Sequence, residues 1–248
     1  MVNVKNQDRD FNVRNFVPHK AALANRAVQK HNARTFADIG GCWGVHAAYT
    51  VDVLSKNAID KAYVADGNVN DQSRAAGRPY PQLEFREGLF NERSFIKPFP
   101  EVDVLLMYSI LLHQANLDWD DFLESWSPKA RVIVVYNQMW KRDETVRFVD
   151  HGLDWYLENV YFTNRQTIID WFGRLDETHS SGRKWRDMHH YWQVGITTED
   201  LIAKMRSLGF RLDLFENFGP FHHRKTPWFQ NEGFIFVRDA PAAAAAAA

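Results

Sequence analysis

A short apolar run near residue 36 ends on Asp38 and is followed by three closely spaced glycines, Gly40, Gly41 and Gly44. Glycine has no Cβ, so a turn built from it can adopt positive φ and let a ligand approach the backbone closely. A helix that begins after such a turn directs its unpaired N–H groups and the positive end of its dipole at the same point. Residues 35–46 therefore predict a strand, a ligand-binding turn, and a helix that begins near Gly44.

The spacing of these glycines excludes two common phosphate-binding motifs. A P-loop ends in Gly-Lys-Ser/Thr, and no such ending follows Gly44. The dinucleotide fingerprint G-x-G-x-x-G is interrupted, because Cys42 stands at its second glycine position. By itself, the turn predicts a nucleotide-like ligand without indicating its class.

Strand-like and helical segments alternate through the first half of the chain. We expect strands at 36–39, 62–65, 83–86, 102–109 and 131–136, and helices at 19–31, 45–54 and 118–126. The run 102–109 is nearly all apolar, as is typical of a strand that is buried on both faces. This alternation predicts an α/β fold with a doubly wound, mostly parallel sheet.

The end of the chain adds a reversed hairpin to this sheet. A helix is expected to begin after Thr197 and to end before Gly209, and two strands are expected at 210–215 and 233–237. The complete sheet then has seven strands. We divide the chain into an N-terminal arm and helix, one domain, and a Pro/Ala tail that has nothing to bury; these are residues 1–33, 34–240 and 241–248.

The alternation stops in an aromatic-rich, helical insertion, residues 137–196, which follows the fifth strand. Trp140, Tyr156 and Trp192 are candidates to bind substrate there, because large rings with polar tips suit a small organic molecule or a sugar. One interpretation of the insertion is a lid over the carboxyl ends of the strands. The other is a helical subdomain with its own core or a dimer interface, so a homodimer is also considered.

Composition and charge narrow the class of protein. A net charge of −1 over 248 residues argues against a protein that binds nucleic acid by bulk electrostatics. The single cysteine cannot form an intramolecular disulfide, which suits a reducing compartment. No apolar run reaches the roughly 18–20 residues of a membrane-spanning helix, and residues 1–10 are too polar for a signal peptide. We expect a soluble, cytoplasmic protein with no membrane partner.

Histidines are the candidates for a catalytic base, since a neutral imidazole accepts a proton near neutral pH. His113 follows the apolar run, where it could reach a substrate or could be a hydrogen-bonded core residue. His189 and His190 lie at the base of the insertion, where one of them could face a substrate. We expect no metal, because no ligand spacing such as His-Glu-x-x-His occurs.

The segment DIGGCWG (38–44) resembles the first motif of the class I S-adenosylmethionine (SAM)-dependent methyltransferases, acid-x-Gly-x-Gly-x-Gly. The order of elements over residues 34–237 is similar to that family as well. The resemblance implies that SAM is the cofactor and that these residues bind it: Asp38, Gly40, Gly41, Cys42, Gly44, Asp66, Leu89, Phe90, Tyr108 and Ser109. In that pattern Asp66 binds the ribose hydroxyls, and two residues depart from it. Cys42 replaces the central glycine, and Leu89 replaces an aspartate at the adenine edge.

The resemblance implies in-line transfer of a methyl group from SAM to a hydroxyl, or less favourably an amine, of a small molecule or glycan. An NAD(P)-dependent oxidoreductase or a non-catalytic nucleotide-binding protein is the alternative, but the dinucleotide fingerprint is missing. An RNA methyltransferase is the third reading. The chain lacks a basic stripe and the Asn/Asp-Pro-Pro-Tyr/Phe signature of amino-group methylation, so a nucleic-acid partner is not expected.

Overall fold

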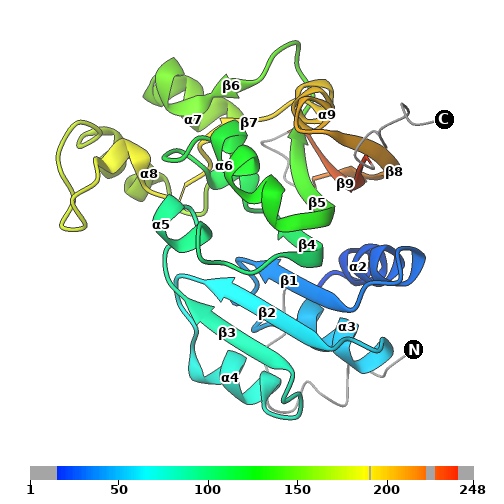
Figure 1. Ribbon diagram of the computed structural model, residues 1–248. Coiled ribbons are helices and arrows are strands. Elements are labelled where there is room, and N and C mark those ends of the chain that lie inside the picture. The colour runs from blue at the N-terminus through cyan, green and yellow to red at the C-terminus, as the bar shows by residue number, and fades with distance from the viewer. Residues whose placement is uncertain (1–15, 190, 222–226, 240–248) are drawn as a thin grey trace.

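The computed structural model describes residues 16–189, 191–221 and 227–239, and a seven-stranded sheet runs through them (Figure 1). The order across the sheet is β3-β2-β1-β4-β5-β9-β8. The strands are β1 (Thr35–Ile39), β2 (Lys61–Asp66), β3 (Leu83–Glu87), β4 (Val102–Tyr108), β5 (Ala130–Trp140), β8 (Phe210–Pro220) and β9 (Phe229–Arg238). The first five are parallel, and β9 and β8 are antiparallel to their neighbours. The predicted fold class, including the reversed terminal hairpin, is confirmed.

The order of strands reverses direction between β1 and β4, which lie side by side although β2 and β3 separate them in sequence. Their registers bring Asp38 opposite Leu106 on β4 and Val64 on β2. The carboxyl ends of β1, β2 and β4 therefore meet at one edge of the sheet. In open α/β sheets, this switch point is where ligands bind.

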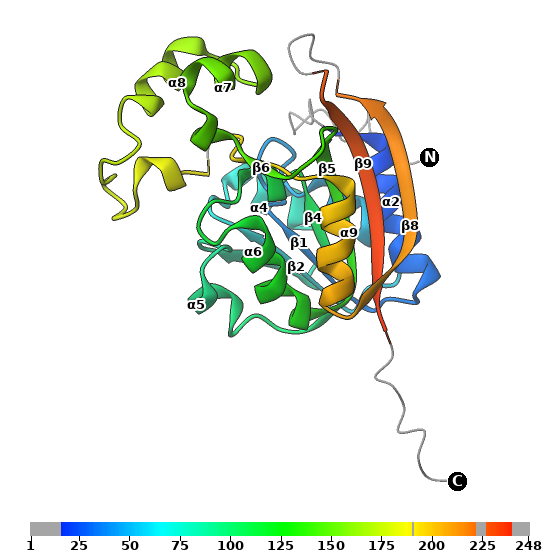
Figure 2. The ribbon, with the colours of Figure 1, turned by 90° about the horizontal axis from the view of Figure 1, so that it is seen from above.

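Helices cover both faces of the sheet, as Figure 2 shows from above. On one face, α2 (Pro18–Lys30) and α3 (Ala48–Lys56) pack on apolar side chains of the strands, with α4 (Asp71–Gly77) beside them. On the other face lie α5 (Arg93–Ile96), α6 (Trp119–Trp126) and α9 (Thr198–Ser207). As predicted, Thr197 caps α9 by accepting a hydrogen bond from the N–H of Asp200 at 3.1 Å, and Gly209 follows its end with φ +80°.

Several element boundaries differ from the expected ones. The helix α3 begins at Ala48, not near Gly44, because His46 and Ala47 both adopt left-handed conformations before it. The strand β5 continues to Trp140, because it pairs with β9 as far as Phe229. The short helices α4 and α5 were not expected, since one or two turns give too little apolar periodicity to be recognised.

The insertion forms a lobe beside the sheet, with α7 and α8 at its outer side (Figure 2). Its elements are β6 (Val146–Arg147), α7 (Leu153–Asn159), α8 (Arg165–Phe172) and β7 (Val194–Gly195). It also contains the short 3-10 helices η3 (Phe148–His151) and η4 (Trp185–Asp187), while η1 (Leu111–His113) and η2 (Ser127–Lys129) belong to the sheet domain. An aromatic core distinct from the apolar cores of the sheet holds the lobe together, and it includes Leu112 and Phe229 of the sheet domain. Within the described ranges, no helix has the length and apolar character needed to cross a bilayer.

Candidate functional site

Asp38, the last polar residue of β1, is almost completely buried behind the glycine turn. Its carboxylate accepts a hydrogen bond from the Thr50 hydroxyl of α3 at 3.0 Å. A Cβ on Gly41 would lie 2.5 Å from the Asp38 carboxylate, and one on Gly40 would lie 2.8 Å from the Ile110 side chain. These two positions therefore require glycine to make room for neighbouring side chains of the protein itself.

The pKa of Asp38 is raised to about 7, chiefly because burial disfavours the charged carboxylate. The hydrogen bond from Thr50 works in the opposite direction, while the nearby charge of Asp66 raises the pKa further. Two acids thus stand close together at the ends of β1 and β2. Their mutual repulsion favours a positively charged group between or beside them.

Asp66 is held by the backbone of the glycine turn. One carboxylate oxygen accepts a hydrogen bond from the N–H of Cys42 at 2.8 Å, and the other accepts one from the N–H of Asn68 at 2.9 Å. Burial raises the pKa of Asp66, and these backbone donors oppose that rise. The acid is therefore fixed in place at the end of β2, and it ties the turn after β1 to the turn after β2.

The turn itself is shaped by left-handed residues. Gly40 and Gly44 have φ of +75° and +70°, in keeping with the prediction that glycines permit this conformation. Cys42 is fully buried, and burial raises the pKa of its thiol to about 12, so the thiolate is disfavoured. Trp43 projects outward with 75% of its surface exposed.

The turn after β3 supplies the next side of the site. Leu89 is exposed, whereas Phe90 is partly buried and lies beside Gly40, since a Cβ on that glycine would be 3.7 Å from the Phe90 ring. The backbone carbonyl of Phe90 accepts a hydrogen bond from the indole of Trp126 at 2.9 Å. Phe90 is thus brought to the glycine turn, and Leu89 stands at the solvent-facing edge.

Tyr108 and Ser109 lie at the carboxyl end of β4, beside the same turn. Ser109 has φ +53°, and its N–H bonds the carbonyl of Tyr136 on β5 at 2.6 Å. Its hydroxyl accepts a hydrogen bond from the Lys20 ammonium at 2.9 Å. The Tyr108 hydroxyl donates to the backbone carbonyl of Lys20 at 2.8 Å. The first turn of α2 therefore covers the end of β4.

His113 ends η1, just beyond β4, and is partly buried. Its Nδ1 lies 2.8 Å from the backbone carbonyl of Tyr191, which belongs to the insertion. A carbonyl only accepts hydrogen bonds, so Nδ1 carries the proton and the lone pair of the neutral ring is on Nε2. The contact with the Tyr191 carbonyl thus holds the orientation of the His113 ring and favours the tautomer with its proton on Nδ1.

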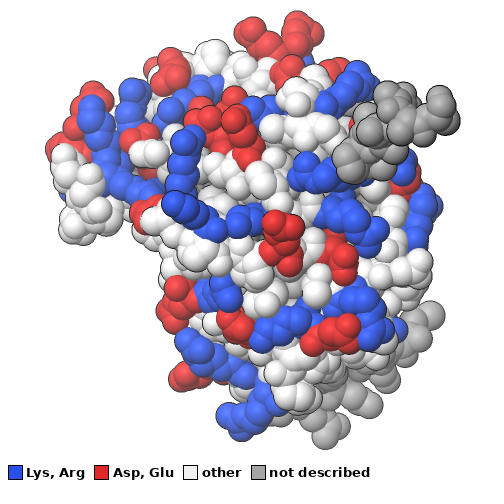
Figure 3. Space-filling model, viewed as in Figure 1, with Lys and Arg blue, Asp and Glu red and all other residues white. Residues whose placement is uncertain are grey.

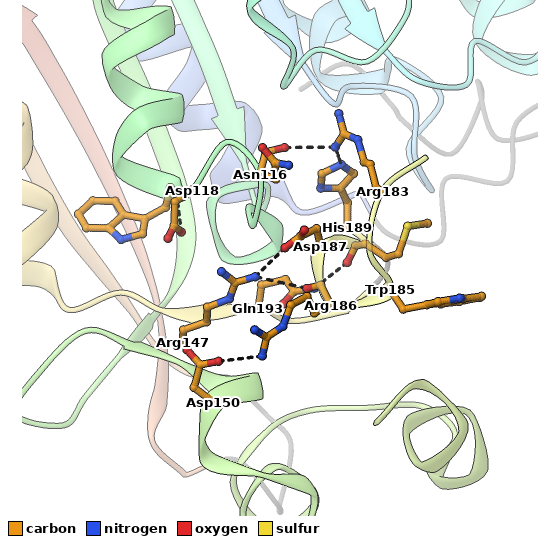
Figure 4. Close-up of polar contacts among 12 residues, drawn as sticks. Asn116, Asp118, Arg147, Asp150, Arg183, Trp185, Arg186, Asp187, His189 and Gln193 are labelled. Atoms are coloured by element: carbon orange, nitrogen blue, oxygen red, sulfur yellow. Dashed lines mark hydrogen bonds and ion pairs between the residues drawn. The ribbon is translucent and has the colours of Figure 1, made fainter. Parts of the chain in front are cut away.

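His189 takes part in a polar network between the insertion and the sheet domain (Figure 4). Its Nε2 lies 2.8 Å from an Arg183 nitrogen and 2.9 Å from the Asn91 amide nitrogen. Arg183 also bonds the carbonyl of Asn116 and forms an ion pair with Glu92 at 2.9 Å. Nε2 therefore accepts hydrogen bonds from two donors. His190 lies outside the described residues.

The predicted substrate residues lie together, but in the core of the insertion rather than beside the glycine turn. Trp140, Tyr156 and Trp192 have exposed fractions of 2%, 0% and 9%. The Tyr156 hydroxyl donates to the carbonyl of Trp192 at 3.0 Å, and Trp140 and Trp192 both pack against Phe229. Their arrangement is that of a packed aromatic core, and their contact with a substrate stays a prediction.

Across the described ranges, no three His, Cys, Asp or Glu side chains are grouped as a metal site would require. Sequence reasoning did not single out Thr50, Lys20, Tyr49 or Tyr136 as site residues. They lie on separate helices and a strand, and only the packing of α2 and α3 on β4 and β5 brings them to the strand ends. No local pattern around any of them signals this.

No protein-family model matches the chain, and no curated protein is significantly similar to it in sequence. Solved structures do match in fold. One is an O-methyltransferase family protein from Burkholderia thailandensis, with TM-score 0.55, 12% identity, and coverage of 90% of this chain and 56% of that chain. This chain thus spans little more than half the length of that protein.

Two further matches were solved with S-adenosylhomocysteine (SAH) bound. The 1,6-didemethyltoxoflavin-N1-methyltransferase of Burkholderia thailandensis has TM-score 0.57 and 11% identity, with coverage of 96% of this chain and 82% of that one. The magnesium protoporphyrin IX methyltransferase of Synechocystis PCC 6803 has TM-score 0.55 and 13% identity, with coverage of 96% and 89%. Together with the strand order, these matches show that the chain has the fold of the class I SAM-dependent methyltransferases.

Proposed function

We propose that this protein is a SAM-dependent methyltransferase that acts on a small molecule. The observation that carries the proposal is the meeting of Asp38, Asp66, Ser109 and the glycine turn at the adjacent carboxyl ends of β1, β2 and β4. These are positions that the motif resemblance assigns to cofactor binding, and they come together on the matching fold.

The charge of this site fits the proposed cofactor. SAM would supply a methyl group activated by a sulfonium, which is a cation. The charge of Asp66 raises the pKa of the buried Asp38 carboxyl, and a cation beside the two acids relieves that repulsion. Asp66 would face the ribose hydroxyls, Phe90 and Leu89 would flank the adenine, and the turn at 40–44 would carry the methionine end.

The residues at the end of β4 would receive the acceptor. The reaction needs the nucleophile aligned with the methyl group and shielded from water, and a hydroxyl acceptor must also lose its proton. His113 is the candidate base, since the Tyr191 carbonyl holds its Nδ1–H and directs Nε2 as the proton-accepting nitrogen. Methylation of a hydroxyl is favoured over that of an amine for this reason.

A small acceptor is favoured over RNA by the distribution of charge. On the face shown in Figure 3, acidic and basic side chains alternate rather than gather in one basic stripe, and the net charge is −1. Binding to a phosphate backbone relies on clustered Lys and Arg. The second candidate, a nicotinamide-dependent oxidoreductase, is disfavoured because Cys42 interrupts the dinucleotide fingerprint.

Calorimetry with three cofactors tests the proposal. SAM and SAH should bind with a Kd in the micromolar range or tighter, about −8 kcal/mol or more favourable. NAD should not bind. If NAD binds to the protein and neither SAM nor SAH does, the proposed function is wrong.

A further inference from the structure

Lys20 places a cation at the site that the acids and the glycine turn form. It lies in the first turn of α2, and its ammonium donates a hydrogen bond to Ser109 Oγ at 2.9 Å. Ser109 in turn follows β4 in a left-handed conformation. A helix from the start of the chain therefore extends its side chain to the switch point of the sheet.

Three tyrosine rings surround this ammonium, and we call them the tyrosine cage. The distances from Lys20 Nζ to the ring centroids are 4.6 Å for Tyr136, 5.8 Å for Tyr108 and 6.0 Å for Tyr49. A cation within about 6 Å of an aromatic centroid is attracted by the ring. The three rings come from β5, β4 and α3, so the cage is assembled by the tertiary fold.

The rings of the cage are held by hydrogen bonds of their hydroxyls. The Tyr108 hydroxyl bonds the Lys20 carbonyl at 2.8 Å, and the Tyr49 hydroxyl accepts from the N–H of Val17 at 3.0 Å. The Tyr136 hydroxyl lies 3.1 Å from His19 Nε2. The cage is thus a preformed arrangement, because its polar tips are fixed while its faces remain turned toward the cation.

Among the residues that the structure describes, none forms a direct ion pair with Lys20. Burial lowers its pKa to about 8, and the more distant charge of Asp38 opposes this fall. In the same way, Lys20 lowers the raised pKa of Asp38. The place is therefore one where a partly desolvated cation is stabilised by rings, a hydroxyl and a buried acid.

We infer that the tyrosine cage, Ser109 and Asp38 form a cation subsite, and that the positively charged methyl donor competes with the Lys20 ammonium for it. This inference rests on the proposed function, because SAM carries two cations, its sulfonium and its α-ammonium. Two unit charges cannot share one partly desolvated subsite without strong repulsion. Lys20 consequently weakens the binding of the donor and must leave the cage when the donor enters.

The test compares three ligands by calorimetry on the wild-type protein and on Lys20→Met. SAM has two cations, SAH has only the α-ammonium, and adenosine has neither. Removing the lysine charge should raise the affinity for SAM about tenfold or more. A tenfold change corresponds to only a fraction of the repulsion energy between two close charges. Adenosine should bind both proteins equally. Lys20→Arg keeps the charge and should bind SAM as weakly as the wild type does.

The SAH arm identifies which cation takes the subsite. If Lys20→Met binds SAM more tightly than the wild type does but binds SAH equally, the sulfonium competes with Lys20. If the affinities for SAM and SAH rise equally, the α-ammonium competes. An unchanged or weakened SAM affinity in Lys20→Met would overturn the inference, since it would mean that Lys20 is a spectator or holds the donor's carboxylate. If neither SAM nor SAH binds to the wild type or to Lys20→Met, the proposed function itself fails.

The cage is tested separately in the Lys20→Met background. Tyr136→Leu removes the ring that lies closest to the ammonium, and it should weaken SAM several-fold while leaving adenosine unchanged. Thermal unfolding of each variant establishes that it is folded at the temperature of titration. An equal loss of affinity for SAM and for adenosine would show a general distortion of the site and would contradict a cation subsite.

Discussion

The carboxyl end of the sheet and the insertion are built in opposite ways. At the sheet, acids and hydroxyls stand at the ends of parallel strands, and their partners are backbone N–H groups and residues of distant helices. In the insertion, the large side chains turn inward and pack on one another, with rings such as Trp171 and Tyr191 stacked at 4.2 Å. The first arrangement places polar groups at the proposed cofactor site, and the second buries apolar area.

This difference shows that an aromatic-rich segment can form a packed core of its own, which is one of the two interpretations of the insertion. Among the described residues, β6 and β7 of the insertion pair over two residues each, so the packing of its aromatic side chains and short helices carries more of its structure than strand pairing does. Some of its polar side chains bond the sheet domain, as Arg183 does with Glu92, and others form ion pairs within the insertion. Arg147 pairs with Asp187 at 3.0 Å, and Arg186 pairs with Asp150 at 3.3 Å, as Figure 4 shows.

The largest expected effects come from removing a buried tryptophan in each region. Trp126→Ala, in the core beneath the sheet, should lower the free energy of unfolding by about 3–5 kcal/mol. Trp171→Ala should instead loosen the insertion and leave SAH binding within a few-fold of wild type. Urea unfolding, limited proteolysis and calorimetry measure these effects. Loss of SAH binding in Trp171→Ala would show that the two regions are not independent.

The contribution of Asp38 to the free energy of unfolding should depend on pH with a sign opposite to that of most acids. Its pKa is raised in the folded state to about 7, so its contribution to stability is present below about pH 4 and is lost as pH rises through 7. As pH rises from 5 to 8, the free energy of unfolding of Asp38→Asn should increase relative to that of the wild type by on the order of 2 kcal/mol. Urea unfolding at both pH values measures the difference.

Asp103, at the opposite end of the sheet, is the matched control. Burial raises its pKa, but the hydrogen bonds from the N–H groups of Arg34 and Thr35 outweigh this and hold the pKa below its usual value. Its contribution is therefore lost as pH falls, and Asp103→Asn should show the opposite trend below pH 5. The same pH trend in both variants would contradict the assignment of Asp38.

His113 tests whether the insertion contributes to the reaction by orienting a base. His113→Ala should lower turnover by roughly a hundredfold, as is typical for loss of a general base, with SAH affinity unchanged. The readout is SAH formation in the presence of any acceptor that supports turnover by the wild type. His189→Ala is the comparison, because Nε2 of that ring accepts from Asn91 and Arg183. Full activity of His113→Ala would make His113 a structural residue.

Asp66 should matter for the cofactor, whereas an exposed acid of the insertion should not. Asp66→Ala removes the acceptor of the Cys42 and Asn68 N–H groups and should weaken SAH by about tenfold, or 1.4 kcal/mol. Asp150→Ala should leave the affinity unchanged. Calorimetry measures the SAH affinity of both variants, and equal affinities would remove Asp66 from the site.

Much of the sheet side could be predicted because strand periodicity and strand order fix where side chains such as Asp66 and Ser109 lie. The start of α3 could not, because the left-handed His46 and Ala47 carry no glycine signal. Lys20 was missed for a different reason. Its role depends on the packing of α2 across β4 and β5, a contact between segments about 90 residues apart that no local pattern encodes.

Hydrogen exchange with and without SAH tests the central claim most directly, because it reports which backbone segments the ligand covers. We predict that SAH slows exchange at 38–47, 66–69 and 88–91, the turns that follow β1, β2 and β3, and leaves 153–172 of the insertion unchanged. Protection confined to the insertion, or no protection at the glycine turn, would contradict a cofactor site at the carboxyl ends of the strands.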